Sequence, residues 1–95
     1  GRGVDRPTYI SGTTAGLAIK TGAGHLGKII ISRNGGGGGD YTLEIYDALS
    51  ATNQIARIAL DSDDTVTADY DITFNVGLYV VITGNGTIGT TITFD

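Results

Sequence analysis

The segment at residues 66–74 constrains the fold more than any other part of this 95-residue chain. Its apolar positions are Val66, Ala68, Tyr70, Ile72 and Phe74, and its polar positions are Thr67, Asp69, Asp71 and Thr73. A repeat of two residues places these two sets on opposite faces, which is the pattern of a half-buried antiparallel strand. The segment therefore predicts a sheet with one face in a core and the other in solvent.

The rest of the chain follows the same kind of pattern in shorter runs. Three isoleucines at residues 29–31 are typical of a central strand, residues 41–46 alternate, and Asn85-Gly86 is a hairpin signal. Thr, Ile, Val and Tyr suit pleated strands, and no stretch has apolar residues at helical spacing with caps. We expect an all-β, antiparallel β-sandwich of seven or eight short strands, with the jelly roll as one candidate arrangement.

The length fits a single domain, which we assign to residues 9–95. Residues 1–8 are mostly polar and contain Pro7, so we expect an extended N-terminal arm there. The chain has no Cys to reinforce its core, and small domains of this kind gain stability by association. The net charge of −4 argues against nucleic-acid binding, and no apolar run approaches the roughly 18 residues that span a bilayer.

Two glycine patterns imitate nucleotide-binding loops. Residues 22–27 and 84–89 both match GxGxxG, but β-branched residues follow each one, whereas a pyrophosphate site needs a helix there. We therefore expect hairpin turns at both places. Residues 22–28 also match most of the sequence pattern of a phosphate-binding loop, but Ile29 stands where that pattern requires Ser or Thr. We therefore predict that Lys28 is an exposed strand residue.

No residue pattern predicts catalysis. His25 is the only histidine, no serine lies in a nucleophile-elbow motif, and we expect His25 to be a turn residue beside a strand. Asp61, Asp63 and Asp64 are predicted to form a solvated acidic turn, with a weak cation site or an acidic contact patch as the alternative. We predict no enzyme activity, no cofactor and no metal site.

Outward-facing apolar residues are the strongest functional signal. Tyr46, Tyr79 and Val81 lie opposite the predicted inward sets of their strands, and exposed apolar clusters rich in Tyr are typical of contact surfaces. The pattern leaves one alternative to a contact surface open, in which a loop of the same chain covers the strands that carry these residues. The candidate partner interface combines the arm with these residues: Arg2, Val4, Arg6, Pro7, Tyr9, Tyr46, Tyr79 and Val81.

Three stretches together resemble a known group of proteins. They are residues 25–31, residues 41–47 with the pattern LxIYD, and residues 70–84 with YDxxF followed by GLxVxxxG. In this order they resemble small β-sandwich virion proteins of tailed bacteriophages, of the capsid decoration or cement type. The resemblance covers roughly residues 15–94 and is a pattern of strands and turns.

The resemblance implies a structural role. It predicts a protein made in the host cytoplasm and carried on the outer surface of the virion capsid, where it binds the major capsid protein and stabilises contacts between capsid subunits. A homodimer or homotrimer would suit the symmetry axes of a capsid. The alternative is a receptor- or carbohydrate-binding module of a phage fibre, spike or tail accessory.

Overall fold

The computed structural model describes residues 6–34, 41–60 and 64–95, and within these ranges the regular structure consists of eight strands. The strands are β1 (Arg6–Ser11), β2 (Thr14–Thr21), β3 (Gly24–Asn34), β4 (Tyr41–Tyr46), β5 (Gln54–Leu60), β6 (Asp64–Phe74), β7 (Gly77–Gly84) and β8 (Thr87–Phe94). No helix in the described ranges has the length and apolarity to cross a membrane. The all-β prediction is confirmed.

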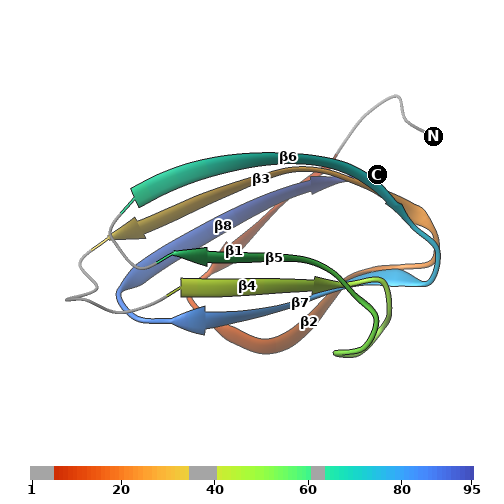
Figure 1. The fold of residues 1–95 in the computed structure, drawn as a ribbon, viewed down its shortest axis with the longest axis horizontal. Coiled ribbons are helices and arrows are strands. Elements are labelled where there is room, and N and C mark those ends of the chain that lie inside the picture. Colours follow the sequence, from red (N-terminus) through yellow and green to blue (C-terminus); the bar gives the residue numbers. More distant parts are fainter. Residues whose placement is uncertain (1–5, 35–40, 61–63) are drawn as a thin grey trace.

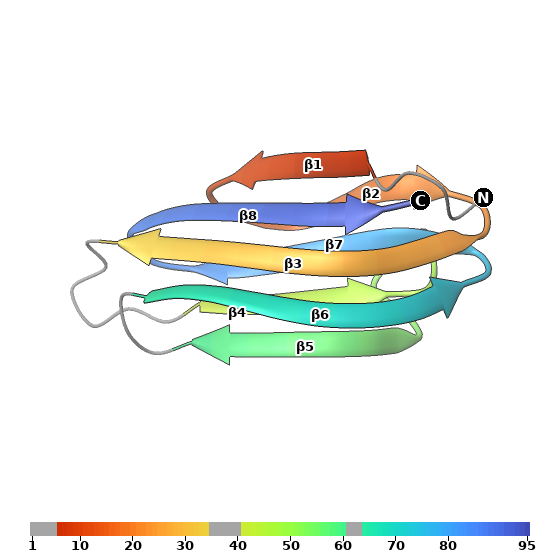
Figure 2. The same cartoon turned by 90° about the horizontal axis from the view of Figure 1, so that it is seen from above.

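The strands form two four-stranded antiparallel sheets packed as a β-sandwich (Figure 1). One sheet has the order β1-β8-β3-β6 and the other β2-β7-β4-β5. The chain changes sheet at every connection except the one between β4 and β5, which is the eight-strand arrangement of a jelly roll. Figure 2 shows β1 and β2 along one long side of the sandwich and β5 and β6 along the other.

The connection between sheets corrects the predicted hairpins. Gly22 and Gly86 do adopt positive φ, at 96° and 86°, as tight turns require. However, β2 and β3 belong to different sheets, and so do β7 and β8. The two glycine patterns therefore mark turns that cross from one sheet to the other, because turn chemistry fixes a reversal of the chain without fixing which strands pair.

The core lies between the two sheets and follows the predicted alternation. On β6 the side chains at positions 65, 67, 69, 71 and 73 are exposed, while Phe74 is buried and Tyr70 packs against the core. β3 is a central strand, with Ile29 and Ile31 fully buried. The Tyr41 hydroxyl shares a hydrogen bond of 2.8 Å with Thr90 Oγ1, and burial raises the pKa of Tyr41 to about 12.

Asp47 joins two connections at one end of the sandwich. It follows β4, and its Oδ1 accepts backbone hydrogen bonds from Val76 at 2.8 Å and from Asn75 at 3.0 Å, in the turn between β6 and β7. These bonds lower the pKa of the Asp47 carboxyl despite its burial. The Gly22 amide also donates to the Val76 carbonyl at 2.8 Å. The turn between β6 and β7 is therefore tied to the aspartate that follows β4.

Two local predictions differ from the structure, and others lie outside the residues that it describes. Arg6, Pro7 and Thr8 belong to β1 instead of an arm, because they pair with β8. His25 lies within β3 instead of a turn, since its backbone exchanges hydrogen bonds with Asp95 at 3.1 and 2.8 Å. Several predicted features lie outside the described residues: Arg2 and Val4 of the arm, the glycine run at 35–39, and Asp61 and Asp63 of the acidic turn.

Candidate interaction surface

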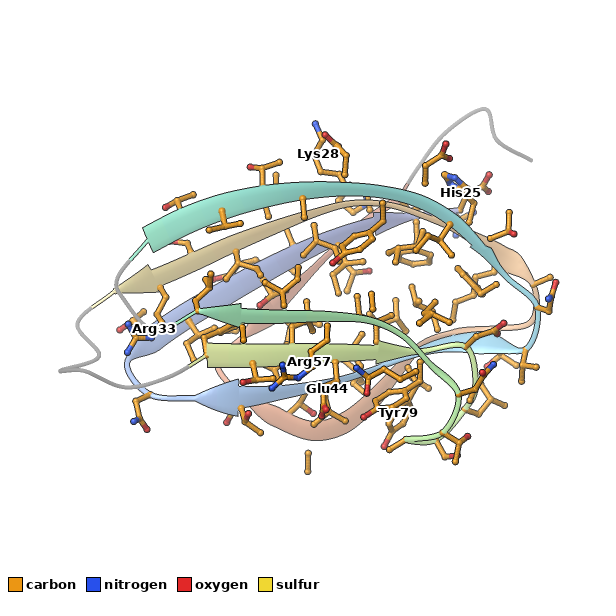
Figure 3. All side chains as sticks on the ribbon, viewed as in Figure 1. His25, Lys28, Arg33, Glu44, Arg57 and Tyr79 are labelled. Atoms are coloured by element: carbon orange, nitrogen blue, oxygen red, sulfur yellow. The ribbon has the colours of Figure 1, made fainter. Side chains whose placement is uncertain are left out.

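Those predicted interface residues that the structure describes lie on two different sheets. Pro7 and Tyr9 are on β1 of the β1-β8-β3-β6 sheet, whereas Tyr46, Tyr79 and Val81 are on β4 and β7 of the other sheet. Figure 3 shows Tyr79 on the outer side of one sheet and Lys28 on the outer side of the opposite one. These residues therefore cannot form one continuous contact surface on a single copy of the chain.

Tyr46 and Tyr79, on neighbouring strands of the β2-β7-β4-β5 sheet, pack against each other. The rings of Tyr46 and Tyr79 meet edge to face, with centroids 6.2 Å apart, and Tyr46 is only 8% exposed. Burial, followed by the neighbouring Glu44 carboxylate, raises the pKa of Tyr46. The Tyr79 hydroxyl occupies the space that a side chain at Gly16 would need. Tyr46 thus supports Tyr79 and presents little surface of its own.

The outer face of the β1-β8-β3-β6 sheet is more open. Tyr9 lies beside Thr91, Thr91 beside Ile30, and Ile30 beside Thr67, so these residues form one row across four strands. Tyr9 is 67% exposed and Ile30 is 36% exposed. The next row consists of Ser11, Gly89, Ser32 and Thr65. We call these two rows the neutral face, because none of their eight residues has a charged side chain.

One end of this sheet is shaped by two β-bulges. The register between β3 and β6 shifts between Leu26 and Lys28, and Asp71 of β6 adopts φ of 60° at this point. β3 and β8 are also offset there, and Thr93 Oγ1 accepts from the Lys28 amide at 2.7 Å and donates to its carbonyl at 3.2 Å. Bulges re-aim side chains, and here they open a depression of about 390 Å³.

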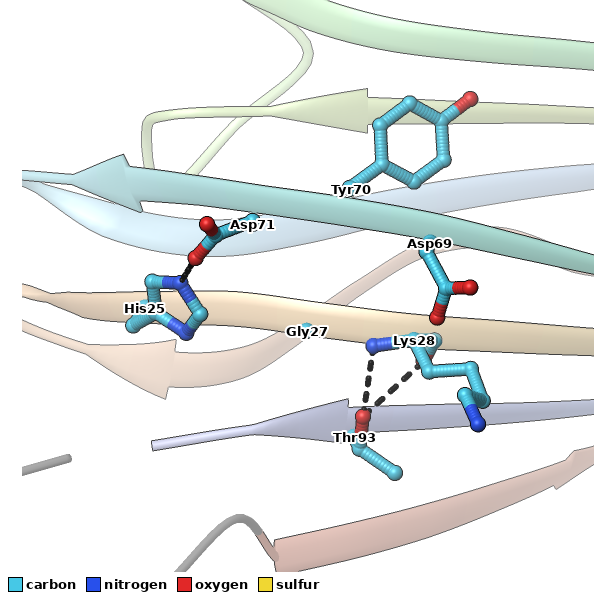
Figure 4. Close-up of a pocket in the computed structure, with 7 residues that line it drawn as sticks. All are labelled: His25, Gly27, Lys28, Asp69, Tyr70, Asp71 and Thr93. Atoms are coloured by element: carbon cyan, nitrogen blue, oxygen red, sulfur yellow. Dashed lines mark hydrogen bonds and ion pairs between the residues drawn. The ribbon is translucent and has the colours of Figure 1, made fainter. Parts of the chain in front are cut away.

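His25 and Asp71 form a hydrogen-bonded pair in this depression, which also contains Lys28 and Asp69 (Figure 4). His25 is 5% exposed, and its Nδ1 is buried with no hydrogen-bond partner in the described part of the chain. A hydrolase triad would need a hydroxyl or thiol nucleophile at that second nitrogen. The pair thus has the carboxylate and the imidazole of such a triad, but no hydroxyl or thiol of the described residues is hydrogen-bonded to His25 Nδ1.

The depression also lacks the features of a metal or stacking site within the ranges described. No three His, Cys, Asp or Glu side chains gather there closely enough to hold a metal ion. The Tyr70 ring points to the opposite side of β6 from Lys28 and Thr93 (Figure 4). The sequence does not predict this depression, because it is created by shifts in strand register and is not marked by any residue motif.

The similarity of this chain to known proteins is found among solved structures, at low sequence identity. No protein-family model matches the chain, and no curated protein matches it. Among solved structures it is similar to the crystal structure of PirA, with 16% identity, a TM-score of 0.45, and coverage of 95% of this chain and 93% of that one. It is also similar to a chain in the structure of infectious bursal disease virus Gt strain, with 10% identity and a TM-score of 0.31. That match covers 96% of this chain but only 34% of the viral chain.

Proposed function

We propose that this chain is a structural virion protein of a tailed bacteriophage that docks on the outer surface of the capsid through its neutral face. The observation that carries the proposal is the exposed Tyr9–Thr91–Ile30–Thr67 row. Interface centres are depleted of charged residues and enriched in Tyr, and this row has both properties. The resemblance of residues 25–31, 41–47 and 70–84 to decoration proteins supports the identity of the partner.

The size of the molecule is compatible with docking on several subunits. A standard interface takes roughly 800 Å² from each partner, which is about one sixth of the 4874 Å² of accessible surface here. The two faces and four long edges leave room for a second and a third contact of that size. Many copies on one shell would then add their individual weak contacts together.

A binding experiment with paired variants tests the docking face. Capsids of the phage that encodes the chain, stripped of accessory proteins, are mixed with the purified chain and sedimented. We expect Tyr9→Ser combined with Ile30→Ser to weaken binding at least about ten-fold, since exposed aromatic anchors dominate interface energies. Val81→Ser is the matched control, because Val81 belongs to the other sheet. Loss of binding in the control alone would overturn the assignment of the face.

The second candidate function is receptor or carbohydrate binding, and the depression near His25 favours it. Asp69 and Lys28 lie beside the His25–Asp71 pair, and carboxylates and ammonium groups bind sugar hydroxyls. However, Tyr70 points away from this site and gives no aromatic platform. A glycan array probed with the labelled chain distinguishes the two functions, since saturable glycan binding abolished by Asp69→Asn would favour this second candidate.

A further inference from the structure

Two cations lie at the opening between the sheets along the β1–β2 side of the sandwich. Arg6 lies opposite Phe94, which packs against the core, and Lys20 lies opposite the fully buried Leu78. Cross-strand partners project from the same face of a sheet, so both cations are on the core-facing side of their strands, where Arg6 remains exposed and Lys20 is partly buried. Lys20 reaches this position because the register of β2 shifts between Ala18 and Lys20. The two charges therefore approach the same opening from opposite sheets.

A cavity of about 390 Å³ lies between these side chains. Ile19 and Phe94, which are partly buried and packed against the core, give it an apolar floor, and Thr21 and Asp95 complete its lining. This volume falls within the range of small-molecule sites. Neither Arg6 nor Lys20 forms an ion pair with any of the described residues, whereas Asp95 does have an interaction partner.

The side chains that line the cavity are richer in cations than those of the whole chain. They include two cations and one anion, Arg6, Lys20 and Asp95, whereas the side-chain charges of the whole chain sum to −4. Inward charges on edge strands discourage edge-to-edge pairing, and this accounts for a charge on each strand separately. It does not account for two cations that converge on one cavity with an apolar floor.

From this arrangement we infer that the cavity binds a carboxylate attached to a small apolar group. The Arg6 guanidinium can hold a carboxylate with two parallel hydrogen bonds, and the Lys20 ammonium adds a second positive charge. The apolar group would cover Ile19 and Phe94. Such a ligand occurs as a free aliphatic acid or as an acidic or C-terminal residue of a peptide.

The test uses hexanoate as the probe, followed by NMR of the Ile19 methyl groups and the Phe94 ring. We expect saturable chemical-shift changes with a Kd on the order of 1 mM. Hexanol, which lacks the carboxylate, and acetate, which lacks the apolar chain, should have little effect. Arg6→Gln and Lys20→Gln should each weaken binding at least about ten-fold. Arg57→Gln is the matched control, because Arg57 is exposed on β5, the opposite edge strand of its sheet.

Two peptide probes identify the source of the carboxylate. N-acetyl-leucine offers a terminal carboxylate, and acetyl-Leu-Asp-amide offers a side-chain carboxylate. Tighter binding of either peptide than of hexanoate would assign the site to a partner chain, and the reverse would assign it to a free acid. Absence of shifts with all three probes, or shifts that survive both cavity variants, would overturn the inference. Capsid docking through the neutral face is measured separately, so the two proposals fail independently.

Discussion

At the scale of single residues, Asp47 has the best-defined structural role. Its carboxylate accepts hydrogen bonds from the backbone of residues 75–77, with the Gly77 amide the most distant at 3.4 Å. Replacing Asp47 by Asn makes the acceptor of these hydrogen bonds neutral. We expect Asp47→Asn to lower the free energy of unfolding by about 2 kcal/mol, as measured by urea denaturation at pH 7. Asp69→Asn, at an exposed position on β6, should change it by less than about 0.5 kcal/mol.

The effect of Asp47 should depend on pH in one direction. A carboxyl whose pKa is lowered on folding stabilises the folded state above its ordinary value of 3.8. That contribution is lost as the pH falls through the lowered pKa. The stability difference between the wild type and Asp47→Asn should therefore be constant above about pH 5 and shrink below pH 3.8. A difference that grows on acidification would contradict the role of the charged carboxylate.

At the scale of the strand, the bulge in β6 depends on the conformation of Asp71. A φ of 60° is unfavourable for residues with a Cβ, but glycine adopts it freely. Asp71→Ala and Asp71→Gly both remove the hydrogen bond with His25, so their difference isolates the backbone. We expect the Ala variant to be less stable than the Gly variant by about 1 kcal/mol in thermal or chemical unfolding. Equal stability would show that the left-handed conformation is not maintained in solution.

The strands themselves were predictable because their signal is local. Alternation with a period of two depends only on neighbouring residues, and it placed Tyr70 and Phe74 inward and Asp69 outward as observed. Strand pairing was less predictable, because it depends on contacts that are distant in the sequence. Asn85-Gly86 specified a turn, but only the packing of the two sheets decides that β8 joins β1 and β3.

The candidate sites were the least predictable features for the same reason. The sequence predicts that Tyr46 and Tyr79 face outward, but Tyr46 is buried, with the Tyr79 ring lying against it. Lys20 and Arg6 meet at one cavity only because of a register shift in β2, and no motif encodes such a shift. Tyr9 was selected as part of the interface, but its neighbours on the neutral face depend on the order of strands β1, β8 and β3.

At the scale of the whole molecule, the jelly roll gives each sheet one outer face, and the two outer faces differ. The neutral face on the β1-β8-β3-β6 sheet exposes Tyr9 and Ile30 without charges, whereas the opposite face contains the packed tyrosine pair together with Glu44 and Arg57 (Figure 3). We therefore expect a defined orientation of the chain as well as a location on the virion. Contact through the neutral face would leave Arg57 directed away from the shell.

An electron-microscopy reconstruction of the purified virion tests both the proposed function and the docking face. We expect many ordered copies of the chain on the capsid surface, with the outer face of the β1-β8-β3-β6 sheet against the major capsid protein and Tyr9 buried in the contact. Absence of the chain from the particle would contradict the proposed function. Copies that meet the shell through the β2-β7-β4-β5 sheet would contradict the proposed docking face.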